Sequence, residues 1–148
     1  DMGRKAKARQ IAATVHQQVN NKRDEHGLSE LAGNATLAQT AESYARKMAQ
    51  QDRISHHLDG STPQARAWKF VGVSENCLKA RNAHRQAGDL ASEAVGRWMH
   101  SAGHRENITR AESSHSGVGV WILNNDVYIV QMFAYRRGVA KIATSLVP

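Results

Sequence analysis

Two runs near the C-terminal end constrain the fold most, because each is apolar on both faces. Residues 117–123 and 127–134 are rich in β-branched and aromatic residues, and the Asn124-Asn125-Asp126 turn between them predicts a hairpin. A sheet with one solvated face would alternate apolar with polar residues, whereas here apolar residues occupy consecutive positions. The sheet must therefore be covered on both sides, and helices are the only elements left to cover it. The sequence predicts an α+β fold, a three-layer α-β-α sandwich with a central antiparallel sheet.

The helices are predicted from the spacing of apolar residues and from capping residues. Four segments carry these signals: residues 4–25, residues 37–52, a short helix opened by Ser61-Thr62-Pro63, and a helix capped by Asp89 that ends near residue 101. A short strand is expected over residues 73–79, followed by a loop over residues 79–88. We expect one domain, in which residues 1–27 form an N-terminal helix, residues 28–135 the core, and residues 136–148 a C-terminal tail or edge strand.

The chain of 148 residues is basic, with 20 lysines and arginines against 13 acidic residues and a formal net charge of +7. We interpret this charge as a soluble basic surface, with attraction to an anionic surface as the alternative. Specific nucleic-acid binding is not expected, because aromatic residues are not interleaved with the basic ones as stacking platforms require. No apolar run is long enough for a transmembrane segment. Cys77 is the only cysteine, so no intrachain disulfide can form.

Two histidines and two glutamates, each in its own short sequence motif, are the candidate functional residues: His56, Glu75, Glu93 and His104. Imidazole and carboxylate groups together can bind a divalent metal or carry out acid–base chemistry if the fold brings them together. Each residue also has a structural interpretation. The histidines can tie a loop to a helix end, Glu75 can accept backbone hydrogen bonds, and Glu93 can pair with Arg97 four residues later.

Several short sequence motifs follow one another in a recognisable order along the chain. They are Ser55-His56, the stretch from Asp59 to Pro63 with Arg66, Glu75-Asn76, Trp98-Met99 leading into Gly103-His104-Arg105, the Gly-Val-Gly-Val of residues 117–120, and the Tyr-x-Val-Gln-x-Phe of residues 128–133. Together they resemble the CAP superfamily, the cysteine-rich secretory, antigen 5 and pathogenesis-related proteins, also called SCP domains. The resemblance covers about residues 28–134, and the scarcity of cysteine resembles the bacterial and archaeal branch.

This resemblance implies a set of functional residues. In the family, a histidine pair that falls here on His56 and His104 can bind a divalent metal, commonly zinc, in a surface cleft beside two glutamates that fall on Glu75 and Glu93. Two positions bear on that assignment: Ser74 stands where the family usually has glycine, and His57 directly follows His56 and could take its place. The resemblance further implies a secreted or cell-envelope protein, with lipid or sterol ligands in some members.

Three functions stay open at this level. The first is binding, through the metal site or through a lipid or anionic ligand, and the lack of an obvious nucleophile favours it. The second is a metal-dependent, peptidase-like hydrolase in which Glu75 or Glu93 is the general base toward a metal-held water. The third is a structural interaction module, in which the four polar residues only organise the loops.

Overall fold

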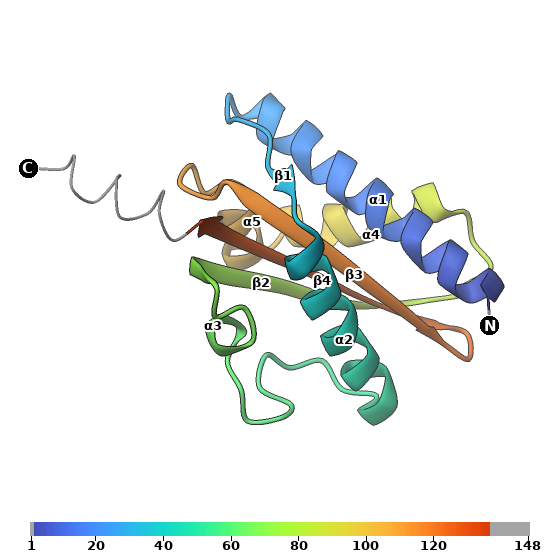
Figure 1. Ribbon diagram of the computed structural model, residues 1–148. Coiled ribbons are helices and arrows are strands. Elements are labelled where there is room, and N and C mark those ends of the chain that lie inside the picture. Colours follow the sequence, from blue (N-terminus) through green and yellow to red (C-terminus); the bar gives the residue numbers. More distant parts are fainter. Residues whose placement is uncertain (1, 137–148) are drawn as a thin grey trace, which may run out of the picture.

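The computed structural model describes residues 2–136, which form one four-stranded sheet and five helices. In chain order the elements are α1 (Met2–Glu25), β1 (Ala32–Gly33), α2 (Ala35–Gln51), α3 (Pro63–Arg66), β2 (Phe70–Arg81), α4 (Ala87–Met99), α5 (Ala102–Ile108), β3 (His115–Leu123) and β4 (Asp126–Arg136). The strand order is β1-β3-β4-β2 (Figure 1). The β2–β4 and β3–β4 pairs are antiparallel, as expected, but β1 pairs with β3 in parallel.

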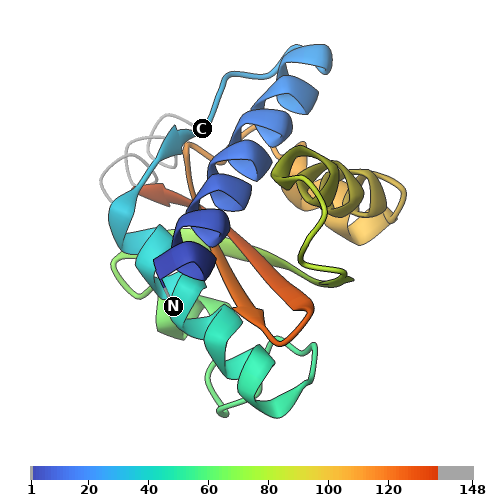
Figure 2. The same cartoon turned by 90° about the vertical axis from the view of Figure 1, so that its right-hand side faces the viewer.

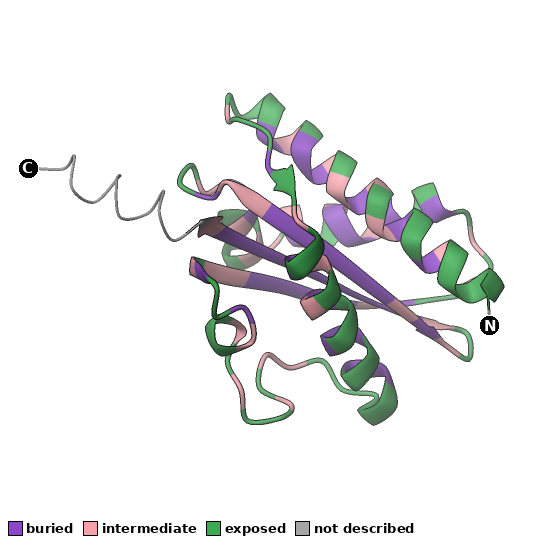
Figure 3. Cartoon of the chain, in the orientation of Figure 1, coloured by how far each residue is buried: buried purple, intermediate pink, exposed green. Residues whose placement is uncertain are grey.

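The sheet separates two apolar cores, which confirms the three-layer sandwich. Alternate residues of β4 enter different cores: Val127 and Ile129 pack with α1, α4 and α5, whereas Tyr128 and Val130 pack with α2. Figures 1 and 2 show α1 and α4 on one side of the sheet and α2 on the other. Buried residues fill the centre of the sheet and the helix faces turned toward it (Figure 3). The two-faced apolar pattern of the strands therefore has the predicted cause.

Two glycines let α2 rest directly on β3. A Cβ atom at Gly117 would lie 2.2 Å from the backbone nitrogen of Ala38, and one at Gly119 would lie 2.0 Å from the backbone nitrogen of Glu42. Distances this short exclude any side chain at either position, because helix backbone cannot move aside as a flexible side chain can. The Gly-Val-Gly-Val motif thus marks a close approach between the backbones of α2 and β3.

A buried arginine and a buried asparagine fasten the end of α1 to the rest of the domain. Arg23 is 1% exposed, and within residues 2–136 its side chain donates hydrogen bonds only to backbone carbonyls, those of Ser29, Ile108, Arg110 and Ser113. The side chain of Asn20 exchanges two hydrogen bonds with the backbone of Leu31. These bonds supply the partners that buried polar groups require, and they make α1 part of the same folded unit.

Several boundaries differ from those expected from the sequence. Strand β2 is longer than the predicted 73–79 and replaces the start of the predicted loop. Helix α4 begins at Ala87 after Gln86, so Asp89 lies inside its first turn, where a negative charge favours the helix dipole, and is not the cap. Neither β1 nor α5 was expected. The C-terminal segment predicted over 136–148 lies outside the described residues except for Arg136. Within residues 2–136, no helix combines the length and apolar character that crossing a bilayer requires.

Candidate functional site

A β-bulge at the start of β2 precedes the first site residue, Glu75. The pairing of β2 with β4 shifts register between Val71 and Ser74, and Gly72 adopts a φ of +61°. A Cβ at Gly72 would also lie 2.7 Å from the Tyr135 ring, so both the backbone angle and the packing require glycine there. Beyond the bulge the ladder resumes, and the Glu75 side chain is fully buried.

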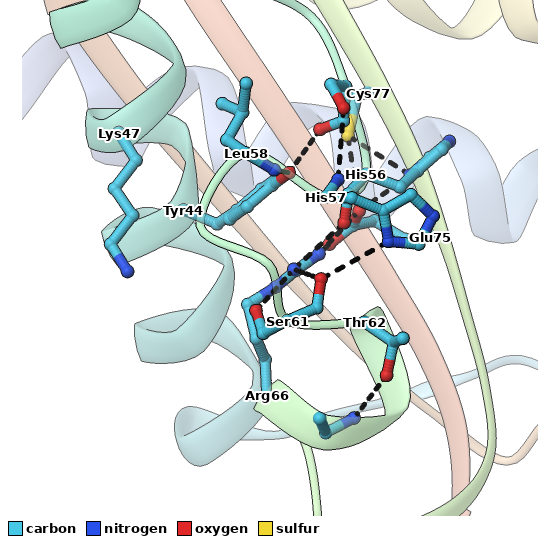
Figure 4. Close-up of polar contacts among 12 residues, drawn as sticks. Tyr44, Lys47, His56, His57, Leu58, Ser61, Thr62, Arg66, Glu75 and Cys77 are labelled. Carbon is cyan, nitrogen blue, oxygen red and sulfur yellow. Dashed lines mark hydrogen bonds and ion pairs between the residues drawn. The ribbon is translucent and has the colours of Figure 1, made fainter.

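Arg66, at the end of α3, holds the buried carboxylate of Glu75. Its Nη2 atom donates to Oε1 at 2.9 Å and to Oε2 at 2.8 Å, and its guanidinium lies 3.6 Å from the centroid of the Tyr44 ring. The Nη1 atom donates to the backbone oxygens of His56 and Ser61 at 3.0 and 3.2 Å. Figure 4 shows Arg66 reaching from its helix along Tyr44 toward Glu75. The arginine therefore both neutralises Glu75 and fixes the loop that carries His56.

His56 is oriented by Glu75. The Nδ1 atom of His56 lies 2.8 Å from Oε1 of Glu75. Because the carboxylate is already paired with Arg66, it acts as an acceptor, so Nδ1 carries a proton, and in the neutral ring the lone pair of Nε2 is free. The His56 side chain is 43% exposed, whereas His57 makes its own contact with the backbone oxygen of Ser61 at 3.3 Å. The structure thus places His56, and not His57, against Glu75.

Tyr44 of α2 fixes the loop on which His56 lies. Its hydroxyl donates to the backbone oxygen of Ser55 and accepts a hydrogen bond from the backbone N–H of Leu58 at 3.2 Å. Burial raises the pKa of Tyr44, so the hydroxyl keeps its proton and can fill both roles. The residues before and after His56 are therefore attached to one buried side chain.

His104 approaches the same place from α5. Its Nδ1 atom lies 2.8 Å from Oγ of Ser101, and its backbone oxygen accepts a hydrogen bond from Asn76 of β2 at 3.1 Å. Asn107 in turn donates to Oδ1 of Asn76 at 2.9 Å, which ties α5 to β2 a second time. Burial, and then the positive charge of His56, lower the pKa of His104. The two imidazoles are thus close enough for their charges to interact.

Cys77 completes a group of possible metal ligands. The ligand atoms of His56, Glu75 and Cys77 all lie within 4.8 Å of one another, so these residues form a possible metal site. The Cys77 thiol lies 3.5 Å from Oε1 of Glu75 and 3.9 Å from Nδ1 of His56. Burial, and then the charge of Glu75, raise the pKa of the thiol far above its ordinary value. Cys77 is therefore a protonated donor here, whereas metals bind the thiolate.

The order of the sequence motifs and the fold both agree with a comparison against known families. The sequence profile of the cysteine-rich secretory protein family, CAP, matches residues 16–133. The chain belongs to the CAP family.

Bacterial proteins are among the relatives of this CAP domain. An uncharacterised Bacillus subtilis (strain 168) protein, YkwD, is 28% identical over 106 residues, a match that covers 68% of this chain and 38% of YkwD. The chain thus spans well under half the length of that relative. Among solved structures, an outer surface protein of Borrelia burgdorferi has a TM-score of 0.74 at 22% identity, over 86% of this chain and 93% of that one. An extracellular SCP-domain protein of Bacillus anthracis has a TM-score of 0.67 at 23% identity, over 84% and 40%. These two likenesses concern the fold.

The fourth candidate residue of the CAP domain, Glu93 on α4, is bound elsewhere. Its Oε1 atom lies 2.7 Å from Nη2 of Arg85, and its Oε2 atom lies 3.1 Å from Nη1 of Arg97. Burial opposes ionisation, but the hydrogen bonds from the two arginines outweigh it and lower the pKa of Glu93. No hydrogen bond or ion pair joins Glu93 to His56 or Glu75 within residues 2–136. The ion pair with Arg97 is the structural interpretation that its helical spacing predicted.

Two residues of this site were not assigned a role from the sequence. Arg66 belongs to the motif that begins at Asp59, but nothing in its position in the sequence indicates that its side chain reaches Glu75. Cys77 resembles a small apolar residue, and only its position two residues after Glu75 on one strand places both on the same face. That shared face is the signal from which the sequence could have found Cys77.

Proposed function

We propose that this CAP domain is a binding module of the cell surface or extracellular space, and that Nε2 of His56 and Nε2 of His104 hold a divalent cation. The observation that carries the proposal is that each imidazole has its Nδ1 atom engaged, by Glu75 at 2.8 Å and by Ser101 at 2.8 Å. The Glu75 carboxylate can only accept, so it fixes the tautomer of His56, and the Ser101 hydroxyl orients the ring of His104; in both rings Nε2 is the nitrogen left for a metal. The lowered pKa of His104 keeps that ligand in its neutral, metal-binding form.

The same contacts favour the two histidines over the group that includes Cys77. Both oxygens of Glu75 accept hydrogen bonds from Arg66, and the thiol of Cys77 is protonated. Glu75 is thus better suited to supporting His56 than to binding the ion. Zinc with only two protein ligands keeps open positions for water or for an exogenous group. An open site of this kind fits reversible ligand binding.

The placement of the carboxylates favours binding over hydrolysis. A general base must be free to take a proton from water, and its pKa is commonly raised toward neutrality. Glu75 is instead locked by Arg66, and Glu93 has a lowered pKa between two arginines. We therefore favour a positioning role for Glu75 and a helix-surface ion pair for Glu93, and hydrolysis with Glu75 or Glu93 as the general base is the alternative.

The location and the ligand class rest on further support. The Borrelia burgdorferi protein is named an outer surface protein and the Bacillus anthracis protein an extracellular one, and we extend that location to this chain. Two exposed apolar side chains flank the site in sequence: Ile54, 47% exposed, two residues before His56, and Trp68, 64% exposed, two residues after Arg66. They suit contact with a lipid or sterol better than contact with a polar ligand.

Calorimetric titration with zinc tests the metal site. We expect one site in the wild type, loss of binding in His56→Ala and in His104→Ala, and unchanged binding in His57→Ala, which serves as the matched control. Cys77→Ser should also bind zinc as the wild type does. Equal zinc binding by His104→Ala and wild type would reject the two-histidine site, and loss of binding in Cys77→Ser would favour the group that includes the thiol.

A further inference from the structure

The outer edge of β3 is only partly covered by a neighbouring strand. Strand β1 pairs with just two of its residues, His115 and Ser116. The backbone N–H of Asn34 donates to the oxygen of Ser116 at 2.9 Å, so the backbone groups of Ser116 point away from β4. Backbone direction alternates along an antiparallel strand, so the N–H and C=O groups of Val118, Val120 and Ile122 point the same way. No group within residues 2–136 forms a hydrogen bond to them on that side.

This free edge lies at the bottom of a groove between two helices. The groove has a volume of about 440 Å³ and lies between α1 and α2, with residues 120–123 of β3 as its floor. Its walls are formed by Arg4, Lys5, Ala8 and Arg9 of α1 and by Glu42 and Arg46 of α2. Figure 1 shows β3 passing between these helices, and Figure 2 shows α1 lying across the sheet beside α2. The groove is remote from Glu75, which lies on β2 at the opposite edge of the sheet.

The walls of the groove carry four cations against one acid. Arg4, Lys5, Arg9 and Arg46 are all exposed, and within residues 2–136 none of their side chains forms an ion pair or a hydrogen bond. Arg46 instead lies over the ring of Trp121, 4.8 Å from its centroid. Unpaired cations concentrated along one groove raise the local concentration of a negative partner. A complementary occupant is therefore acidic.

We propose that this groove receives an extended acidic segment of a partner protein, which adds to the edge of β3 as a strand in line with β1. Such a strand would lie about 4.8 Å from β3 and bond to the outward groups of Val118, Val120 and Ile122. Val120 is only 1% exposed, so the strand enters by displacing the long, exposed side chains of the walls, those of Arg4, Lys5, Arg9 and Arg46. The domain already uses this edge in the same way, through its own β1.

The alternation of side chains along a strand predicts the sequence of the partner segment. Val120 and Ile122 belong to the core beneath α1, whereas Trp121 and Leu123 pack beside the core beneath α2. Side chains of an added strand would likewise alternate between the two walls. Those on the α1 side meet Arg4, Lys5 and Arg9, and those on the other side meet Trp121 and Leu123. The favoured segment alternates acidic with apolar residues.

A synthetic peptide of four Glu-Val repeats, with blocked ends, tests the proposal in the full chain. Fluorescence anisotropy measures its affinity, and amide hydrogen exchange by NMR locates its contacts. We expect the peptide to slow exchange at the amides of Val118, Val120 and Ile122 and to leave those of Gly119 and Trp121, which already face β4, unchanged. The double variant Arg4→Glu/Arg9→Glu should bind roughly tenfold more weakly or worse. The control double variant Arg53→Glu/Lys69→Glu has the same net charge, and it should bind as the wild type does.

A second peptide separates strand addition from simple charge attraction. N-methylation of every other amide in the Glu-Val peptide keeps its charge but removes the donors that a strand needs, so binding should be lost. Equal affinity of the methylated peptide would overturn the proposal, as would peptide binding without protection of the three amides. Binding of inorganic polyphosphate or anionic vesicles with no binding of the peptide would also overturn it, and so would self-association of the chain through this edge. Thermal melting of each variant confirms that the variants are folded.

Discussion

Replacing Arg66 with methionine tests whether the guanidinium holds the site together. The Glu75 side chain is fully buried and that of Arg66 is only 9% exposed, so solvent screens their attraction little. Loss of one partner leaves a buried, uncompensated charge, which costs about 3–5 kcal/mol. Out of a total stability of about 5–15 kcal/mol this is a large fraction. For a chain of this size it corresponds to a fall in Tm of roughly 6–20 °C. Methionine keeps the unbranched stem, so most of the packing against Tyr44 remains.

Urea unfolding of a double-mutant cycle isolates the interaction. Glu75→Gln removes the charge that Arg66 neutralises, so the double variant Arg66→Met/Glu75→Gln should lose less stability than the sum of the two single variants, by about 1–3 kcal/mol. Arg53→Met, at an exposed position, is the control and should change stability by less than about 0.5 kcal/mol. Single-variant effects that add within about 0.5 kcal/mol would show that the contact from Arg66 to both oxygens contributes nothing specific, and that Arg66 does not hold Glu75 in place.

Three further predictions concern the framework. Arg23→Met should destabilise the domain by about 3–5 kcal/mol in urea unfolding, because four backbone carbonyls lose their donor. The control Lys22→Met should have little effect, and similar losses of stability in both variants would contradict the role of Arg23. Gly119→Ala should lower the free energy of unfolding by about 1–3 kcal/mol or more, measured by thermal melting, because the added Cβ would clash with α2. Gly88→Ala is the control: no atom lies within 4 Å of the added Cβ, so this variant should be as stable as the wild type or more stable. Burial raises the pKa of Tyr128 from 10.0 to about 12, so its contribution to stability is complete below pH 10 and is lost as the pH rises through 12. Tyrosinate absorbance should show this late step in the wild type and not in Tyr128→Phe.

The layers of the fold could be predicted because the strands carry the information locally. Consecutive apolar residues in β3 and β4 would expose apolar side chains if one face of the sheet were open to solvent, so the sandwich follows from the strands alone. Strand β1 could not be predicted, because two residues define no periodicity and the pairing is set by its neighbours. Helix α5 has only seven residues, and the glycine within it weakens the helical signal.

The sequence indicated candidate site residues where they belong to recognisable motifs. His56, Glu75 and His104 were proposed from their resemblance to a family pattern; in the structure His56 contacts Glu75, and Asn76 of β2 bonds to the backbone of His104. Glu93 could be interpreted in two ways, and its helical spacing from Arg97 indicated the ion pair that the structure contains. The roles of Arg66 and Cys77 depend on contacts between α3 and β2, which no local pattern records. Chemistry that arises from tertiary contact was therefore the part that sequence reasoning missed.

The hydrogen bonds of Arg23 have a consequence for mutational tolerance. Every acceptor of this side chain in the described part of the protein is a backbone carbonyl, and a carbonyl is present whichever amino acid supplies it. Residues such as Ser29 and Arg110 can therefore be replaced without removing the acceptor, whereas position 23 has no equivalent substitute, since lysine lacks the planar fork that reaches several acceptors at once. Saturation mutagenesis of this domain should find that position 23 tolerates no substitution, whereas the positions that supply its carbonyl acceptors tolerate many. The junction between the first helix and the C-terminal half thus depends on one side chain and on the path of the chain around it.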